Sequence, residues 1–141
     1  VIFVTKLYPD NHASFKQFGG KYLKHCVENT FGANLHNDLI VKSSDIIINR
    51  CTLQKFDSNS AFYNAETIEK PTKLKYFLEL NEISQIYFCG NNMDTCIFST
   101  IMDALNLKFN CFVITDMIGY QNKENYDNCV KCLEKLNVTF I

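Results

Sequence analysis

The stretch "FCGNNMDTCIFSTIMDAL" (88–105) contains the pattern that decides the fold class. A short apolar run ends at Gly90, a polar turn follows, and from Asp94 the apolar residues recur at helical spacing. This alternation continues on both sides, with helices predicted over 70–82, 94–107 and 122–136 and strands over 83–90, 109–116 and 137–141. Short apolar strands separated by helices are typical of a parallel sheet covered on both faces. We therefore predict one α/β domain over 1–141, a three-layer α/β/α fold with a doubly wound, mainly parallel sheet.

The first half of the chain is less regular. Strand-like runs at 1–5 ("VIFVT") and 45–49 ("DIIIN") flank a long segment that has no convincing periodicity. That segment holds all three histidines and several aromatic residues. Long irregular loops in compact domains are usually functional or disordered, and this composition favours a functional one.

Composition excludes several classes of protein. The formal net charge is -1 and no basic patch is present, so neither nucleic acid nor a membrane surface is an expected partner. No apolar run approaches the roughly 20 residues that cross a bilayer, and no signal-peptide pattern opens the chain. Seven cysteines, an odd number, lie mostly in apolar segments. They predict a protein with reduced thiols in a reducing compartment, and not a secreted one.

Cys96 lies where chemistry is expected in such a fold. Ligands of open parallel sheets bind outside the carboxyl ends of the strands, and Cys96 comes just after one of these ends. Asp94 is the predicted N-cap of the following helix. Backbone N–H groups and the helix dipole at a first turn lower a thiol pKa and hold a developing oxyanion. Position alone leaves two interpretations open, a nucleophile or a thiol that packs beneath the sheet edge.

Four segments carry a resemblance across almost the whole chain. They are "HASF" (12–15), "KYLKHCVENTFGANLH" (21–36), "INRCTLQKFDSNSAF" (48–62) and "CGNNMDTCIFSTIMDAL" (89–105). In order and spacing they resemble the isochorismatase-like cysteine hydrolases and, within them, the nicotinamidases (pyrazinamidases). The isochorismatase branch needs no metal, but it lacks the H-C-V and D-S-x-S-A-F patterns of the second and third segments.

The resemblance implies an amidohydrolase of NAD salvage that acts on a linear carboxamide. Nicotinamide would be converted to nicotinate and ammonia through a thioester on Cys96. The backbone N–H groups of Asn92 and Cys96 would form the oxyanion hole, and a cis peptide would precede Met93. Phe15, Tyr22 and Met93 would line the substrate pocket, although core packing is an equal alternative for Phe15.

The position of the family's catalytic lysine holds Arg50 in this chain. Arginine can stabilise a thiolate electrostatically but cannot shuttle protons, since its pKa exceeds about 12. We take Arg50 as a catalytic residue, and the alternative is an ordinary strand-end cation.

The family's metal site is only partly matched. His12 and His25 match two of its ligands, and zinc would be the expected divalent metal. The D-x-H pattern is absent: Lys6 or Leu7 falls on the aspartate, and Leu7, Tyr8 or Pro9 falls around the histidine. Two histidines alone make a weak zinc site, so Asp10 is considered as a substitute ligand.

The family's general-base aspartate lies on a first strand that precedes this stretch of chain. We therefore expect an N-terminally incomplete domain without its first strand and helix. The alternative function is that of a catalytically inactive relative that binds a small molecule or a protein. Homo-oligomers and a cytoplasmic, possibly also nuclear, location are expected from the resemblance.

Overall fold

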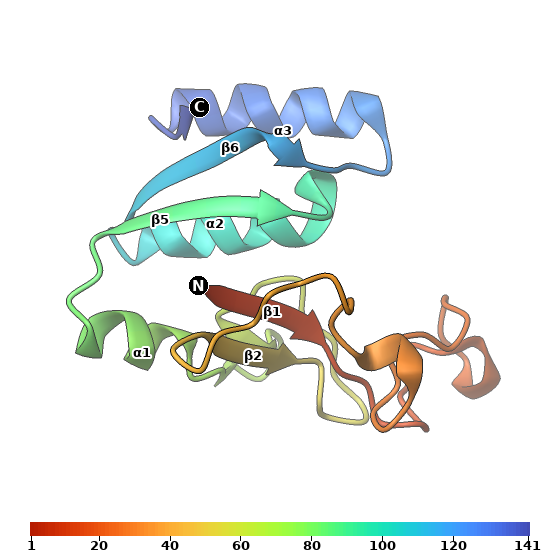
Figure 1. The fold of residues 1–141 in the computed structure, drawn as a ribbon. Coiled ribbons are helices and arrows are strands. Elements are labelled where there is room, and N and C mark those ends of the chain that lie inside the picture. Colours follow the sequence, from red (N-terminus) through yellow and green to blue (C-terminus); the bar gives the residue numbers. More distant parts are fainter. The chain divides into compact units, whose positions relative to one another are not determined.

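The computed structural model describes residues 1–141, and the chain forms two compact units (Figure 1). The N-terminal unit comprises Val1–Leu74 and the C-terminal unit comprises Lys75–Ile141. The single domain expected over 1–141 stays a prediction.

The C-terminal unit is built on a parallel sheet. Strands β5 (Gln85–Gly90), β6 (Asn110–Ile118) and β7 (Thr139–Phe140) pair in the order β5-β6-β7. Helix α2 (Phe98–Asn106) connects β5 to β6, and α3 (Lys123–Lys135) connects β6 to β7 (Figure 1). Parallel strands joined by helices confirm the predicted α/β class. None of the helices combines the length and apolar character that a bilayer crossing requires.

The two connecting helices follow directly from their sequences. Ile97, Ile101 and Ala104 recur at helical spacing and are buried, so they form the inner face of the first connection. Helix α3 begins after Asn122, whose side-chain oxygen accepts a hydrogen bond from the Asn125 N–H at 2.9 Å. This is the usual capping of a helix N-terminus by asparagine.

Pairing in register brings the loops that follow β5 and β6 to one edge of the sheet. Phe88 pairs with Val113, and beyond an irregularity Gly90 pairs with Ile118. In a parallel pair, both carboxyl ends lie at the same edge, where ligands bind in open α/β sheets. The segment before Cys96 and the segment before α3 therefore meet.

The N-terminal unit contains two small sheets. Strands β1 (Ile2–Lys6) and β2 (Ile46–Arg50) are parallel, with Lys6 opposite Arg50. The long irregular segment between them forms 3-10 turns at Lys16–Phe18 and Phe31–Ala33. A core cluster of Tyr8, Phe15, Val27 and Cys51 packs this segment together. The apolar residues of this segment show no periodic spacing, because the contacts that hold the segment together are long-range and irregular.

One predicted helix is shorter than expected. The sequence favoured a helix over 70–82, but Lys70–Pro71 forms strand β4, which is antiparallel to β3 (Tyr63–Ala65), and helix α1 spans Leu74–Leu80. Proline has no N–H to donate, so it fits a short edge strand as well as a helix start. Thr72 separates the two elements: its N–H donates to the Phe62 carbonyl at 2.8 Å.

Candidate functional site

Cys96 lies in a single π-helical turn at the junction between β5 and α2. The turn, η3 (Met93–Ile97), follows Asn92, which has extended backbone angles and is the N-cap. Cys96 is half-buried, and its Sγ lies 3.5 Å from the Thr95 hydroxyl. One-turn π-bulges occur frequently at functional sites. The predicted position of this thiol, at the carboxyl end of a strand and the start of a helix, is confirmed.

The nucleophile turn, meaning residues 90–97, is fastened by the loop that follows β6. The Gly119 carbonyl accepts from the Met93 N–H at 2.9 Å, and the Gly119 N–H donates to the Gly90 carbonyl at 2.9 Å. The Asp94 carboxylate accepts from the backbone N–H groups of Gln121 and Asn122, the latter at 2.9 Å. These contacts fix the turn through backbone atoms and one carboxylate.

Two expectations about this turn are wrong in detail. Asp94 does not cap its own helix, because its carboxylate is turned toward the backbone before α3 and Asn92 occupies the N-cap. The cis peptide is Asn91–Asn92, one residue earlier than expected. Met93 is fully buried, so its side chain packs within the protein. An oxyanion hole formed by the N–H groups of Asn92 and Cys96 stays a prediction.

In the N-terminal unit, Tyr8 separates the two histidines that were predicted to bind metal. The Tyr8 ring centroid lies 4.5 Å from that of His12 and 5.2 Å from that of His25. Tyr8 and His12 are fully buried, whereas His25 is exposed. Phe15, predicted for the substrate pocket, is also fully buried and packs edge-on against Tyr8 at 5.3 Å. This packing agrees with the core alternative, and a place for Phe15 in the substrate pocket stays a prediction.

The side chains of the predicted metal ligands are engaged elsewhere. Both ring nitrogens of His12 make hydrogen bonds: Nδ1 accepts from the Ser14 N–H at 3.1 Å, and Nε2 lies 2.9 Å from the Phe56 carbonyl. Asp10 forms an ion pair with Lys24 at 2.6 Å. No cluster of three or more His, Cys, Asp or Glu side chains that could hold a metal occurs in the structure. As they are placed here, His12, His25 and Asp10 do not form a group that fits a divalent metal, and the expected metal site stays a prediction.

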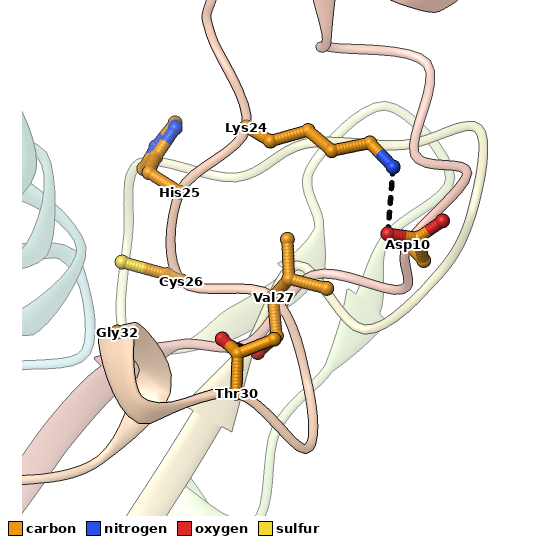
Figure 2. Close-up of a pocket in the computed structure, with 7 residues that line it drawn as sticks. All are labelled: Asp10, Lys24, His25, Cys26, Val27, Thr30 and Gly32. Carbon is orange, nitrogen blue, oxygen red and sulfur yellow. Dashed lines mark hydrogen bonds and ion pairs between the residues drawn. The ribbon is translucent and has the colours of Figure 1, made fainter.

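Beside these residues lies an open hollow of about 270 Å³ (Figure 2). In Figure 2, His25 stands at one side of the hollow and the Lys24–Asp10 ion pair at the other, so histidine and aspartate do not converge. The remaining lining residues are Cys26, Val27, Thr30 and Gly32. Tyr22 has an exposed ring at 5.8 Å from His25. An exposed aromatic face of this kind is suited to stacking on a flat ligand.

Asp57 is the centre of a second group of polar side chains, which we call the Asp57 cluster (Lys6, Tyr8, Ser14, Cys51 and Asp57). The Asp57 carboxylate accepts from the Tyr8 hydroxyl at 3.1 Å, the Ser14 hydroxyl at 2.9 Å and the Cys51 thiol at 2.9 Å. Lys6 completes the cluster: its Nζ donates to the Tyr8 oxygen at 3.0 Å and lies 3.8 Å from Asp57. The lysine therefore donates to the tyrosine, and the tyrosine donates to the aspartate.

Protonation states in the Asp57 cluster follow from these contacts. Burial alone would raise the pKa of Asp57, but hydrogen bonds from Cys51 and Ser14 and the charge of Lys6 hold it below its usual value. Burial, then the hydrogen bond to Asp57 and its charge, raise the pKa of Cys51 to about 11. Burial likewise raises the pKa of Tyr8, and the charges of Cys51 and Asp57 add to this. The cluster therefore holds one carboxylate among neutral donors and one ammonium.

Arg50 ends β2 beside this cluster. It is almost fully buried, its guanidinium donates to the Ser58 carbonyl, and its Nη1 lies 3.9 Å from the Cys51 sulfur. Cys51, which follows it, has a left-handed backbone with φ of 63°. The predicted catalytic role of Arg50 stays a prediction.

Sequence reasoning did not identify the Asp57 cluster as a unit. Lys6 and Tyr8 stood out only as mismatches to a metal pattern, and Cys51 only as a departure at a glycine position. The usable signal was that several mismatches occurred together. A single missing ligand would be a chance substitution. A lysine, a tyrosine and a cysteine together near one matching aspartate indicate that other side chains have replaced the surroundings of the metal site.

The comparison with known proteins decides the family. The isochorismatase domain matches residues 1–141. The chain belongs to this family. Among curated relatives, the nicotinamidase of Escherichia coli (strain K12) is 32% identical over 124 residues, which cover 77% of this chain and 58% of that protein. The chain thus spans less than two thirds of the length of two curated nicotinamidases, those of Escherichia coli and Acinetobacter baylyi, and the resemblance to nicotinamidases is confirmed.

Solved structures of the family share the fold. PnC1 from L. infantum in complex with nicotinate superimposes with a TM-score of 0.92 at 28% identity, covering 99% of this chain and 70% of that one. A pyrazinamidase of Pyrococcus horikoshii in complex with zinc has a TM-score of 0.89 at 24% identity, with coverage of 99% and 73%. The second likeness concerns the fold alone. That neighbour contains zinc, whereas no group of three or more His, Cys, Asp or Glu side chains that could hold a metal occurs in this chain.

Proposed function

We propose that this chain is the Cys96-bearing part of a nicotinamidase-like amidohydrolase that converts nicotinamide to nicotinate and ammonia. The observation that carries the proposal is Cys96 on a fastened π-helical turn at the carboxyl end of β5. Family membership and the nicotinamidases among its relatives support the substrate class. The nicotinate complex of a 28% identical neighbour supports a flat pyridine ligand.

The reaction proceeds in two balanced steps. The Cys96 sulfur forms a bond to the carboxamide carbon, the C–N bond breaks, and ammonia leaves with the proton that the thiol gave up. Water then attacks the thioester, which releases nicotinate and restores the thiol. By the resemblance, the backbone N–H groups of Asn92 and Cys96 would hold the oxyanion of both steps. Arg50 would contribute positive charge but no proton transfer.

Ammonia release from nicotinamide tests the proposal. We expect Cys96→Ala to reduce the rate by at least about a thousandfold, because the variant lacks the sulfur that forms the proposed thioester. Cys89→Ala is the matched control, since this exposed thiol lies in the adjoining strand and should be dispensable. Circular dichroism of both variants would establish equal folding. Equal loss in both variants, or turnover that survives in Cys96→Ala, would refute the role of Cys96.

The alternative function is that of a catalytically inactive relative. A lysine, a tyrosine and a buried thiol surround Asp57, and the predicted metal ligands do not converge. A non-catalytic relative that binds a flat ring compound or a protein would keep the fold and tolerate these changes. Saturable nicotinate binding without any ammonia release would favour this alternative.

Assembly and location are proposals from the resemblance alone. Self-association into homo-oligomers can be measured by light scattering of the full chain. A cytoplasmic, possibly also nuclear, location in the service of NAD salvage is consistent with the thiol state of the seven cysteines.

A further inference from the structure

The region of the predicted metal site already contains a fixed cation. The Lys6 ammonium donates to the Tyr8 oxygen at 3.0 Å and lies 3.8 Å from the Asp57 carboxylate, and its side chain is only 21% exposed. A divalent ion beside this ammonium would be repelled by it. The Asp57 carboxylate could offset this repulsion, but it already accepts hydrogen bonds from three side chains, those of Tyr8, Ser14 and Cys51.

His12 cannot serve as a ligand in its present environment. Its Nδ1 accepts from the Ser14 N–H at 3.1 Å, so the ring proton resides on Nε2 and is donated to the Phe56 carbonyl at 2.9 Å. A metal needs a free lone pair on one ring nitrogen. Freeing either nitrogen would leave a partly buried backbone group without this partner. The Tyr8 ring also lies directly against the His12 imidazole, with 4.5 Å between centroids.

The same contacts give Lys6 a defined direction. An ammonium has three N–H donors; one donates to the Tyr8 oxygen at 3.0 Å, and the Asp57 carboxylate attracts the ammonium as an ion pair at 3.8 Å. The hydroxyl of Tyr8 is itself oriented because it donates to Asp57. A lysine held by two partners at the edge of an aromatic group is a preorganised hydrogen-bond donor for an acceptor atom on a flat ring.

We propose that Lys6 is a specificity-determining residue: its ammonium donates to the ring nitrogen of a pyridine ligand, and the protein binds that ligand without a divalent metal. The ligand class rests on the proposed function, since it takes the pyridine carboxamide and its carboxylate product as the molecules recognised. Lys6 is not required to take part in bond making, so its contribution appears as a preference for rings that carry an acceptor.

Binding of nicotinate and benzoate to the full chain tests the ligand part. The two anions share the carboxylate and the ring shape, and only nicotinate has a ring nitrogen. We expect nicotinate to bind about tenfold more tightly to the wild type, as a hydrogen bond to a charged donor allows. In Lys6→Met the two affinities should become equal. Lys16→Met, an exposed lysine in the same unit, should keep the wild-type preference.

A second variant covers the case that Lys6→Met folds poorly. Tyr8→Phe keeps the buried ring but removes the oxygen that holds Lys6, so the preference should fall by a smaller factor. A preference for nicotinate that is unchanged in both variants would overturn the role of Lys6.

Calorimetric titration with zinc chloride tests the metal part. We expect no stoichiometric zinc binding that depends on His25, compared between the wild type and His25→Ala, and ammonia release that is unaffected by a chelator. Tight binding of one zinc that is lost in His25→Ala would overturn the inference while leaving the amidohydrolase intact. Absent ammonia release together with a Lys6-dependent nicotinate preference would refute the proposed function and support the inference.

Discussion

The nucleophile turn and the Asp57 cluster are held in place by different kinds of contact. Around Cys96, the Gly119 backbone pairs with both Gly90 and Met93, and side chains contribute little besides Asp94. Around Asp57, hydroxyl, thiol and ammonium groups converge on one carboxylate. Backbone contacts depend weakly on residue identity, whereas side-chain contacts depend on every member. The turn can therefore keep a family geometry while the cluster is rebuilt around new residues.

Removing the Asp57 carboxylate should give the largest effect on stability. In Asp57→Ala, three buried or half-buried side-chain donors lose their acceptor and Lys6 loses its counter-charge. We expect the free energy of unfolding to fall by about 3 kcal/mol. Urea denaturation measures this, and Asp38→Ala is the matched control because its side chain is 92% exposed. Hydrogen exchange should rise first within residues 1–74.

An Asp57→Ala variant as stable as Asp38→Ala would contradict this view of the cluster. The hydrogen bonds would then be a consequence of packing around Tyr8 and Phe15, and the contrast with the nucleophile turn would disappear.

Two glycines, Gly20 and Gly119, test the same comparison, with a smaller expected loss of unfolding free energy. At Gly20 a Cβ would overlap the Ser14 carbonyl carbon and the Ala13 oxygen, which are backbone atoms that cannot move independently. We expect Gly20→Ala to lower the free energy of unfolding by about 2 to 3 kcal/mol. At Gly119 a Cβ would meet the Asn91 side chain, whose amide is exposed and can rotate. Gly119→Ala should therefore cost less than about 1 kcal/mol.

The double variant Gly119→Ala/Asn91→Ala provides the control for the smaller effect. Truncating Asn91 removes the atom that a Cβ at Gly119 would meet, so stability should return close to that of Asn91→Ala alone. If Gly119→Ala proved the more damaging single change, the nucleophile turn would be the less tolerant region and the comparison would be reversed.

The two regions also differ in how far the sequence could predict them. In the C-terminal unit, the predicted strand over 83–90 and helix over 122–136 correspond to β5 (Gln85–Gly90) and α3 (Lys123–Lys135). Apolar residues at regular spacing made these elements predictable, and the position of Cys96 followed from them. The role of Asp94 was wrong because its partners, Gln121 and Asn122, lie in a loop that is distant in sequence. The cis bond was expected one residue too late.

The Asp57 cluster was beyond sequence reasoning for a physical reason. Tyr8 and Ser14 contact Asp57 across 49 and 43 residues, with no periodic pattern to relate them. The motif around His12 and His25 indicates metal ligands only if the neighbouring residues are also those of a metal site. With Tyr8 between the imidazoles, the same histidines became packing and hydrogen-bonding residues.

A pH-dependent effect concerns two buried thiols, one in each unit. Burial raises the pKa of Cys111, on β6, to about 11, and at Cys51 burial and the contact with Asp57 together give about 11. The unfolded thiol ionises near pH 8.5. Because the folded pKa is the higher one, each thiol's contribution to stability is complete below about pH 8.5 and is lost as pH rises through 11. Between pH 8 and 10.5 we expect a loss of roughly 1 to 2 kcal/mol per thiol, absent in the matching Cys→Ala variant.

Asp57→Asn separates the two causes. Replacing the carboxylate by an amide removes the charge that opposes ionisation of Cys51 but leaves the surroundings of Cys111 unchanged. The pH at which a maleimide begins to label Cys51 should fall, while that of Cys111 stays constant, as site-resolved mass spectrometry would measure. Equal shifts at both thiols would mean that general loosening of the fold controls access. A shift confined to Cys51 would show that the carboxylate itself sets the chemistry of this unit, as the contacts of Asp57 require.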